Sequence, residues 1–178
     1  DFVFDGNKSI PYTEEDQPNP TGVYGQTKLE GEQVIQQIAE KYYIIRTSWV
    51  YSEFGNNFMK TMLRLASERD TLNVVNDQIG TPTYAVDLAK ALLQIITSAK
   101  ENYGIYNFSN EGVCSWFDFA KKIFEVNHVT IELNPIPTSA YPTPAKRPKY
   151  SVLDKSKIKS IFGVSISKWD EKLGENVC

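Results

Sequence analysis

The chain has 178 residues, of which 41% are hydrophobic and 12% aromatic, so it can bury a core of its own as a single globular unit. A formal net charge of -3 offers no basic stripe that could track phosphates, which argues against nucleic acid or an anionic membrane as a partner. No apolar run approaches the roughly 20 residues that a membrane-spanning helix needs.

The predicted elements alternate between strands and helices from the start of the chain. DFVF at 1–4, followed by Asp-Gly, predicts the end of a buried strand that enters a turn, and 7–22 form a long loop rich in Pro and Asn. Apolar spacing and turn residues then predict, in chain order, a helix over 23–42, a strand over 43–47, a helix over 57–68, a strand over 72–75, a helix over 85–98, a strand over 105–108, a helix over 115–126, a short helix over 155–162 and a last helix after 167. The Pro-rich residues 130–150 break this pattern and are not expected inside a sheet. The alternation is typical of an α/β protein with a largely parallel sheet.

Cysteine and histidine are scarce. Cys114 and Cys178 form no CxxC motif, which favours reduced thiols in the cytoplasm. The single histidine, His128, cannot by itself build a metal site or a Ser-His-Asp triad, and its place at the end of a predicted helix indicates a surface or capping residue.

The stretch PTGVYGQTKLEGE contains the strongest candidate for chemistry. Tyr24 and Lys28 lie four residues apart on a predicted helix, so both side chains share one face, where the ammonium would favour the phenolate and lower the pKa of the tyrosine. Such a tyrosine can donate a proton when hydride adds to a carbonyl, and the lysine can also hold a cofactor ribose. A chain of this composition contains about one such pair by chance, so the spacing alone leaves open a pair of ordinary surface side chains.

Six segments carry a family resemblance. In order and spacing they resemble the dTDP-4-dehydrorhamnose reductases of the extended short-chain dehydrogenase/reductase superfamily, over nearly the whole chain: DFVFDG, YGQTKLEGE, RTSWVYSEFGNNF, VVNDQIGTPTYAVDLA, CSWFDFAKKI and AKRPKYSVLD. The Tyr-x-x-x-Lys signature belongs to the whole superfamily, whereas RTSWVY and the Asp-Gln-x-Gly-x-Pro-Thr run are narrower. The resemblance favours the catalytic interpretation of the pair.

The resemblance implies a single unit over 1–178. It would be the C-terminal part of a Rossmann-like, doubly wound parallel sheet plus a small mixed α/β substrate-binding region, with substrate-binding segments at approximately 48–83 and 105–178. Tyr24 would protonate the C4 oxygen, and Lys28 would lower the pKa of Tyr24 and bind the nicotinamide ribose. The family's Ser or Thr partner stands just before Asp1, outside the chain, and Asp1 itself is an expected substrate contact.

Four further residues are expected substrate contacts by resemblance. Trp49 would stack on the sugar, although it could instead be a packing tryptophan. Asn57 and Phe58 lie where family members approach the nucleotide-sugar, and Arg147 offers a fork of donors for the diphosphate. Phe58 could equally be core, and Arg147 a solvated charge.

The cofactor expectation is NADPH or NADH with an incomplete site. The glycine-rich turn that receives a dinucleotide pyrophosphate is absent, and the chain opens at a later strand, so βαβ units of about 100 residues are expected to be missing from its N-terminus. The isolated chain should then bind the cofactor poorly and not turn over, and the DFVF strand should offer an open edge for self-association or a homodimer. Some family members bind Mg²⁺ through acidic residues, but Val86 stands at one such place, so no metal is predicted.

The predicted function is reduction of the 4-keto group of dTDP-4-dehydro-L-rhamnose to dTDP-L-rhamnose, a dTDP-sugar used for cell-surface polysaccharide. One alternative is another nucleotide-sugar epimerase, dehydratase or reductase of the same superfamily. A second, of a different class, is a non-catalytic regulatory or binding subunit with the same fold, although such a module would have no need to retain Tyr24, Lys28 and Trp49 together.

Overall fold

The structure is a computed structural model that describes residues 1–143 and 145–175. Its helices are α1 (Val23–Ile38), α2 (Phe58–Glu68), α3 (Ala85–Thr97), α4 (Trp116–Val126), α5 (Ser156–Phe162) and α6 (Trp169–Glu175), with a 3₁₀ turn η1 at Thr138–Ala140. Its strands are β1 (Tyr43–Arg46), β2 (Val50–Tyr51), β3 (Thr71–Val75), β4 (Ile79–Gly80), β5 (Thr83–Tyr84), β6 (Gly104–Asn107), β7 (Cys114–Ser115) and β8 (Glu132–Ile136).

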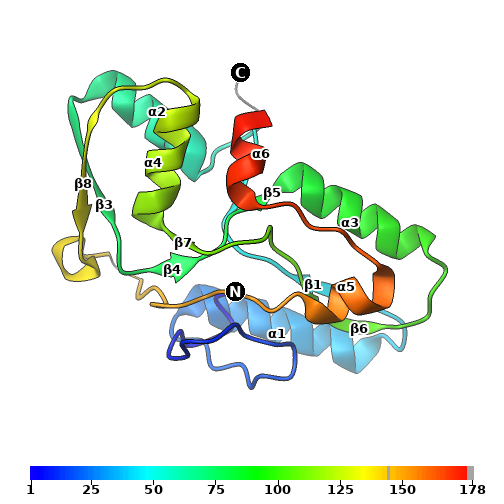
Figure 1. The fold of residues 1–178 in the computed structure, drawn as a ribbon. Coiled ribbons are helices and arrows are strands. Elements are labelled where there is room, and N and C mark those ends of the chain that lie inside the picture. Colours follow the sequence, from blue (N-terminus) through cyan, green and yellow to red (C-terminus); the bar gives the residue numbers. More distant parts are fainter. Residues whose placement is uncertain (144, 176–178) are drawn as a thin grey trace.

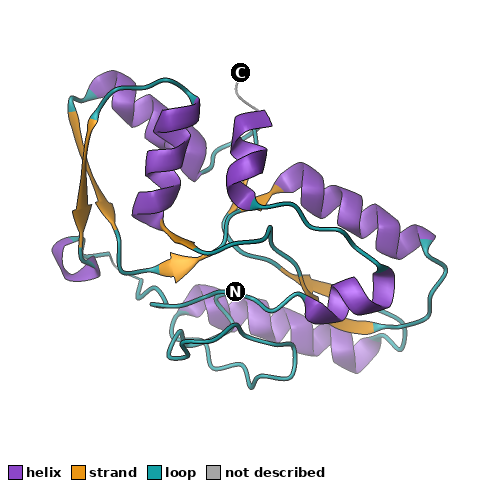
Figure 2. Cartoon of the chain, viewed as in Figure 1, coloured by secondary structure: helices purple, strands orange, loops and turns teal. Residues whose placement is uncertain are grey.

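Strand pairing is mostly parallel. Within the described ranges, β1 pairs with β6, β2 with β5 and β3 with β8, all parallel, while β4 and β7 pair antiparallel. The predicted α/β class with parallel pairing is therefore confirmed, but the strands form four two-stranded pieces instead of one continuous sheet. Figure 2 shows these short orange strands spread among the helices.

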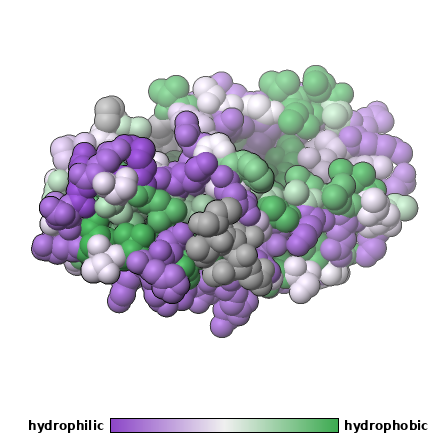
Figure 3. Space-filling model, turned by 90° about the horizontal axis from the view of Figure 1, so that it is seen from above, coloured by the Kyte–Doolittle hydropathy of each residue, from purple (hydrophilic) through white to green (hydrophobic). Residues whose placement is uncertain are grey.

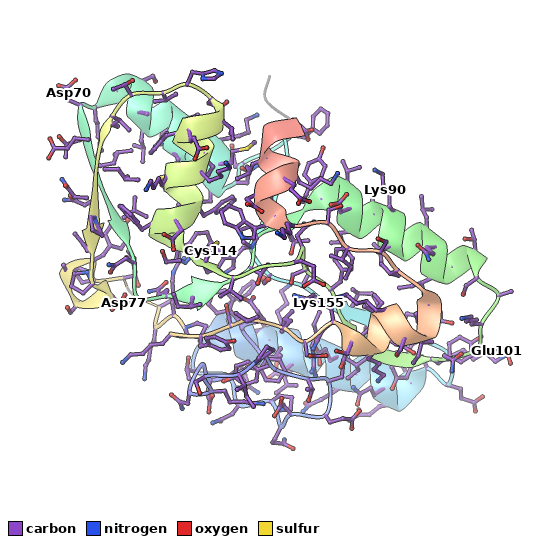
Figure 4. The ribbon with its side chains drawn as sticks, viewed as in Figure 1. Asp70, Asp77, Lys90, Glu101, Cys114 and Lys155 are labelled. Atoms are coloured by element: carbon purple, nitrogen blue, oxygen red, sulfur yellow. The ribbon has the colours of Figure 1, made fainter. Side chains whose placement is uncertain are left out.

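Figure 1 shows two lobes that lie side by side. In one lobe α2 and α4 pack beside β3 and β8, around a core that includes Tyr51, Phe119 and Ile123. In the other, α3 and α5 cover β1 and β6, around a core that includes Tyr106 and Phe108. A third, smaller cluster joins the first residues of the chain to the segment before α5. Cys114 is the first residue of β7, two residues before α4 begins (Figure 4).

The predicted strand over DFVF is wrong. Residues 1–4 form turns, with the Phe4 amide donating to the Asp1 carbonyl at 3.1 Å. Val3 and Phe4 are nevertheless buried, so the apolar run does report burial. A short run of this kind becomes a strand only where a neighbour takes up its backbone groups, and here local turns take them up instead. The expected open strand edge is therefore absent from the structure.

The expectation that 130–150 stay outside a sheet is also wrong. Strand β8 lies in this stretch and pairs in parallel with β3, with Pro135 opposite Val74. Because β8 has only one neighbour in the described structure, its proline can turn its missing N–H away from the ladder, as edge strands allow.

The other predicted elements are confirmed to within a few residues. The largest shift is in α1, which ends at Ile38, four residues before its predicted end, where Ala39 takes an extended conformation. His128 is exposed just after α4, as predicted. Cys114 is buried and free, while Cys178 lies outside the described residues.

Candidate active site

The start of α1 brings the predicted Tyr/Lys pair together. Gly22 precedes the helix in an extended conformation, and Tyr24 and Lys28 follow one turn apart. The Lys28 ammonium lies 5.3 Å from the centre of the Tyr24 ring, and Phe2 meets that ring edge to face at 5.7 Å. Tyr24 is 62% exposed. An accessible phenol with an ammonium nearby can donate a proton to a bound carbonyl oxygen.

A cavity of about 410 Å³ opens beside this pair. One face of α1 forms its first wall, β1 and the following Thr47 form the second, and 1–3 form the third. Asp1 thus lies in the same cavity as Tyr24 and Lys28, and its amino group donates to the Thr47 carbonyl at 2.9 Å. One carboxylate oxygen of Asp1 is buried and has no hydrogen-bond partner among the described residues.

A second, larger cavity of about 530 Å³ lies in the other lobe. Phe58 and Arg147, 89 positions apart in the chain, both line it, so the structure brings these two predicted residues together. Trp116, Arg69 and Tyr141 also line it and were missed from the sequence. Of these only Trp116 lay within a family segment, CSWFDFAKKI, whereas Arg69 could not be told from a solvated charge.

Trp49 does not line either cavity among the described residues, because its ring packs behind Trp116. The two indoles stack with centroids 3.6 Å apart and planes at 11°. A β-carbon at Gly80 would lie 2.6 Å from the Trp49 ring, so glycine is required there for the ring to fit. The backbone of Trp49 adopts a φ of 46°, a conformation that costs a non-glycine residue free energy. One face of Trp49 is therefore taken by Trp116.

Asn57 serves as the cap of α2. Its side-chain oxygen accepts from the Lys60 amide at 3.1 Å, and its side-chain nitrogen donates to the Ser52 carbonyl at 2.7 Å. These bonds satisfy an open N–H at the helix start and tie down the loop after β2. Asn57 thereby sets the position of Phe58, which follows it and lines the larger cavity.

Two titratable groups outside both cavities have pKa values that their surroundings shift. Burial raises the pKa of the Cys114 thiol, which keeps it unreactive near neutral pH. A hydrogen bond from the Tyr84 hydroxyl lowers the pKa of Glu53. Among the described residues, no group of three or more His, Cys, Asp or Glu side chains could hold a metal ion, and no helix is both long and apolar enough to cross a membrane.

Solved structures share this fold. The crystal structure of a dTDP-4-dehydrorhamnose reductase from Clostridium acetobutylicum has a TM-score of 0.94 at 46% identity, over 98% of this chain and 61% of that one. The reductase from Bacillus anthracis in complex with NADP has a TM-score of 0.91 at 41% identity, over 98% and 61%. A UDP-glucuronic acid 4-epimerase from Bacillus cereus, at 20% identity and a TM-score of 0.75, shows the fold alone. The fold is that of the extended short-chain dehydrogenase/reductases.

The particular family follows from the sequence match. The RmlD substrate binding domain family matches residues 1–177, and the chain belongs to it. The dTDP-4-dehydrorhamnose reductase of Aggregatibacter actinomycetemcomitans is 49% identical over 183 residues, which cover 97% of this chain and 62% of the relative. The reductase of Sinorhizobium fredii is 44% identical over 180 residues, covering 96% and 61%. The resemblance seen in the sequence is confirmed, and the chain spans about three fifths of the length of these relatives.

Proposed function

We propose that this chain supplies the proton donor and the substrate-binding part of an NAD(P)H-dependent dTDP-4-dehydrorhamnose reductase. The observation that carries the proposal is the Tyr24/Lys28 pair, held one turn apart at the wall of a cavity and accessible from solvent. The reaction reduces the 4-keto group of dTDP-4-dehydro-L-rhamnose to the alcohol of dTDP-L-rhamnose.

The residues around the smaller cavity fit the nicotinamide-ribose end of the cofactor. Lys28 presents donors with no acceptor role, which suits ribose hydroxyls, and about 410 Å³ lies within the usual range of ligand pockets. A relative of this chain from Bacillus anthracis was solved in complex with NADP. When bound, the reduced nicotinamide supplies the hydride that adds to C4 of the sugar.

Tyr24 would complete the reduction with a proton. As the C4 carbonyl takes up hydride, its oxygen becomes an alkoxide, and the Tyr24 hydroxyl donates its proton to that oxygen. The nearby Lys28 ammonium stabilises the phenolate left behind. The phenolate then regains its proton from solvent, which its exposure permits.

The larger cavity would hold the nucleotide end of the substrate. Arg147 and Arg69 supply guanidinium groups suited to the diphosphate, while Phe58 and Trp116 supply aromatic surface suited to the base. Trp49 would contribute indirectly, by supporting the ring of Trp116. Asn57 would contribute by positioning Phe58 at the start of α2. Asp1, beside the catalytic pair, remains a proposed contact to the sugar.

Two further proposals concern the cellular location and the oligomeric state. The free, buried Cys114 thiol supports a cytoplasmic location. We also propose a homodimer. The open strand edge at 1–4 that first suggested it is not a strand in the structure, so it no longer supports this proposal.

The test is an assay of the complete gene product with dTDP-4-dehydro-L-rhamnose and NADPH. We expect Tyr24→Phe to lower kcat by about 10² to 10⁴, because the general acid is lost. Tyr42→Phe, which removes a hydroxyl outside both cavities, is the matched control. Equal rates for Tyr24→Phe and the unsubstituted protein would exclude the proposed acid.

Product analysis separates the competing enzymes. An epimerase or dehydratase of this superfamily would convert the sugar without net consumption of NADPH. A non-catalytic subunit would show no turnover at all in the complete gene product and would co-purify with a stoichiometric enzyme partner.

A further inference from the structure

A buried ion pair joins the catalytic helix to strand β1. The Arg46 Nε lies 2.9 Å from Glu32 Oε1, and the Arg46 Nη2 lies 2.7 Å from Glu32 Oε2. Both carboxylate oxygens are therefore held by one guanidinium fork. The two side chains are only 4% and 10% exposed, and the proton donation described above uses neither of them.

Glu32 belongs to the same helix face as the catalytic pair. Tyr24, Lys28 and Glu32 follow each other at intervals of four residues, and all three line the smaller cavity together with Arg46. A lysine and a glutamate at this spacing on a helix are within reach of an ion pair. In the structure Lys28 instead lies over the Tyr24 ring, while Glu32 turns to Arg46.

The other charges around this face come from the start of the chain. The amino group of Asp1 and its carboxylate lie in the same cavity, and the Arg46 guanidinium lies 5.2 Å from the centre of the Phe4 ring. Asp1 is thus the one further residue among the described cavity residues that carries charge, besides Lys28, Glu32 and Arg46. The Asp1 amino group interacts electrostatically with both Arg46 and Glu32, but burial lowers its pKa to about 5, so near neutral pH the Arg46 guanidinium is the cation that holds Glu32.

We propose that Arg46 is a positioning residue for the catalytic pair. By holding both oxygens of Glu32, it prevents Glu32 from drawing the Lys28 ammonium away from Tyr24 and leaves that ammonium free for the phenol and the ribose. The inference rests on the proposed roles of Tyr24 and Lys28. It assigns to the ion pair an electrostatic task in addition to fastening α1 onto β1.

The experiment follows the Tyr24 ring signal by NMR with [¹³Cζ]tyrosine, assigned with Tyr24→Phe, as a function of pH. We expect Arg46→Met to move the midpoint of the Tyr24 titration to higher pH, because the freed Glu32 carboxylate pairs with Lys28. Glu32→Gln leaves Arg46 in place and should move the midpoint to lower pH. Arg46→Met with Glu32→Gln should return it close to the starting value.

A second comparison isolates the part of Lys28. In a Lys28→Met background, Arg46→Met should shift the Tyr24 midpoint much less than it does when Lys28 is present. A shift of the same size in both backgrounds would overturn the proposal, since Arg46 would then act without Lys28. An unchanged midpoint in both Arg46→Met and Glu32→Gln would leave the pair a purely structural fastening and would equally overturn it.

The controls separate folding from electrostatics. Arg64→Met breaks the exposed Arg64–Glu68 pair on α2 and should leave the Tyr24 midpoint unchanged. Thermal unfolding of every variant reports lost stability, and Glu32→Gln keeps the proposal testable if Arg46→Met does not fold. Because the titration needs no turnover, absence of reductase activity would count against the proposed function without deciding this inference.

Discussion

Gly25 is a point of close approach between α1 and the start of the chain. A β-carbon at Gly25 would lie 2.1 Å from the Phe2 carbonyl oxygen, closer than any real contact allows. Glycine at this position thus lets α1 pack against the segment that carries Asp1 and Phe2, two residues of the smaller cavity.

We expect Gly25→Ala to destabilise the chain by about 1–3 kcal/mol, since α1 or the N-terminal segment must move apart. Urea unfolding measures this change. Gly31→Ala on the same helix is the matched control: its β-carbon meets nothing within 4 Å, and alanine should stabilise the helix by up to about 1 kcal/mol. Similar changes in the free energy of unfolding from both substitutions would show that the close approach at Gly25 does not limit which residue fits there.

Trp49 and Trp116 show how a residue's partner decides its role. Both tryptophans lie within family segments, yet Trp116 lines the larger cavity, and Trp49 packs against the ring of Trp116 and lines neither cavity among the described residues. The strained backbone at Trp49 and the glycine at position 80 are the local conditions that let the two rings stack.

At the scale of elements, α2 depends on its cap. Asn57→Ala removes the acceptor for the Lys60 amide and should cost about 1 kcal/mol, measured by thermal unfolding. Asn57→Asp keeps the acceptor and places a negative charge at the helix N-terminus, so it should retain most of the stability. If Asn57→Asp were as damaging as Asn57→Ala, the bond to the Ser52 carbonyl, and not the cap, would be the important contact.

The loop that leads into α1 is held by carboxylates. Asp16 accepts hydrogen bonds from the Lys8 ammonium and the Thr13 amide, which lower its pKa, and a backbone hydrogen bond from Asn7 lowers the pKa of Asp5. A depressed carboxyl pKa stabilises the fold above the unfolded value of about 3.9. That stabilisation is lost as the pH falls through the folded value.

We therefore expect acid to loosen this loop below about pH 4. Hydrogen exchange of the loop amides, compared between neutral and acid pH, measures the loss of protection. Asp16→Asn should reduce protection at neutral pH and weaken its dependence on acid. Protection factors, corrected for the intrinsic exchange rate at each pH, that stay equal in neutral and acid solution would contradict the assignment.

At the scale of the whole molecule, two helices carry apolar side chains on their outer faces. Val34 and Ile38 on α1 are 51% and 79% exposed, and Leu93 and Ile96 on α3 are 62% and 69% exposed. Hydrophobic residues also reach the surface among hydrophilic ones in the view of Figure 3. Exposed apolar patches on a protein surface mark contacts with another surface.

We expect the chain to self-associate through these helix faces as its concentration rises. Leu93→Glu with Ile96→Glu should lower the average mass in sedimentation equilibrium, because charges oppose burial of the face. Phe54→Glu alters an isolated exposed ring, 80% accessible, and is the control. A concentration-independent monomer mass for the unsubstituted chain would rule the association out.

Local sequence patterns were sufficient to predict the helices of this protein and one pair of neighbouring side chains. The helices follow from apolar spacing and turn residues, and the Tyr24/Lys28 pair follows because an interval of four residues on a helix brings side chains together whatever the rest of the fold does. The family segments added the proposed roles of these residues, which spacing alone could not supply.

The tertiary structure decided what depends on distant partners. Pro135 lies in a strand because β3, some 60 residues earlier, offers it an edge, while DFVF is not a strand because local turns take up its backbone. Trp116 faces the larger cavity because Trp49 occupies the space behind it, and Arg46 meets Glu32 only once β1 packs beside α1. A residue's own sequence neighbourhood carries its conformational preference, whereas its burial and its partners are set by segments that fold against it.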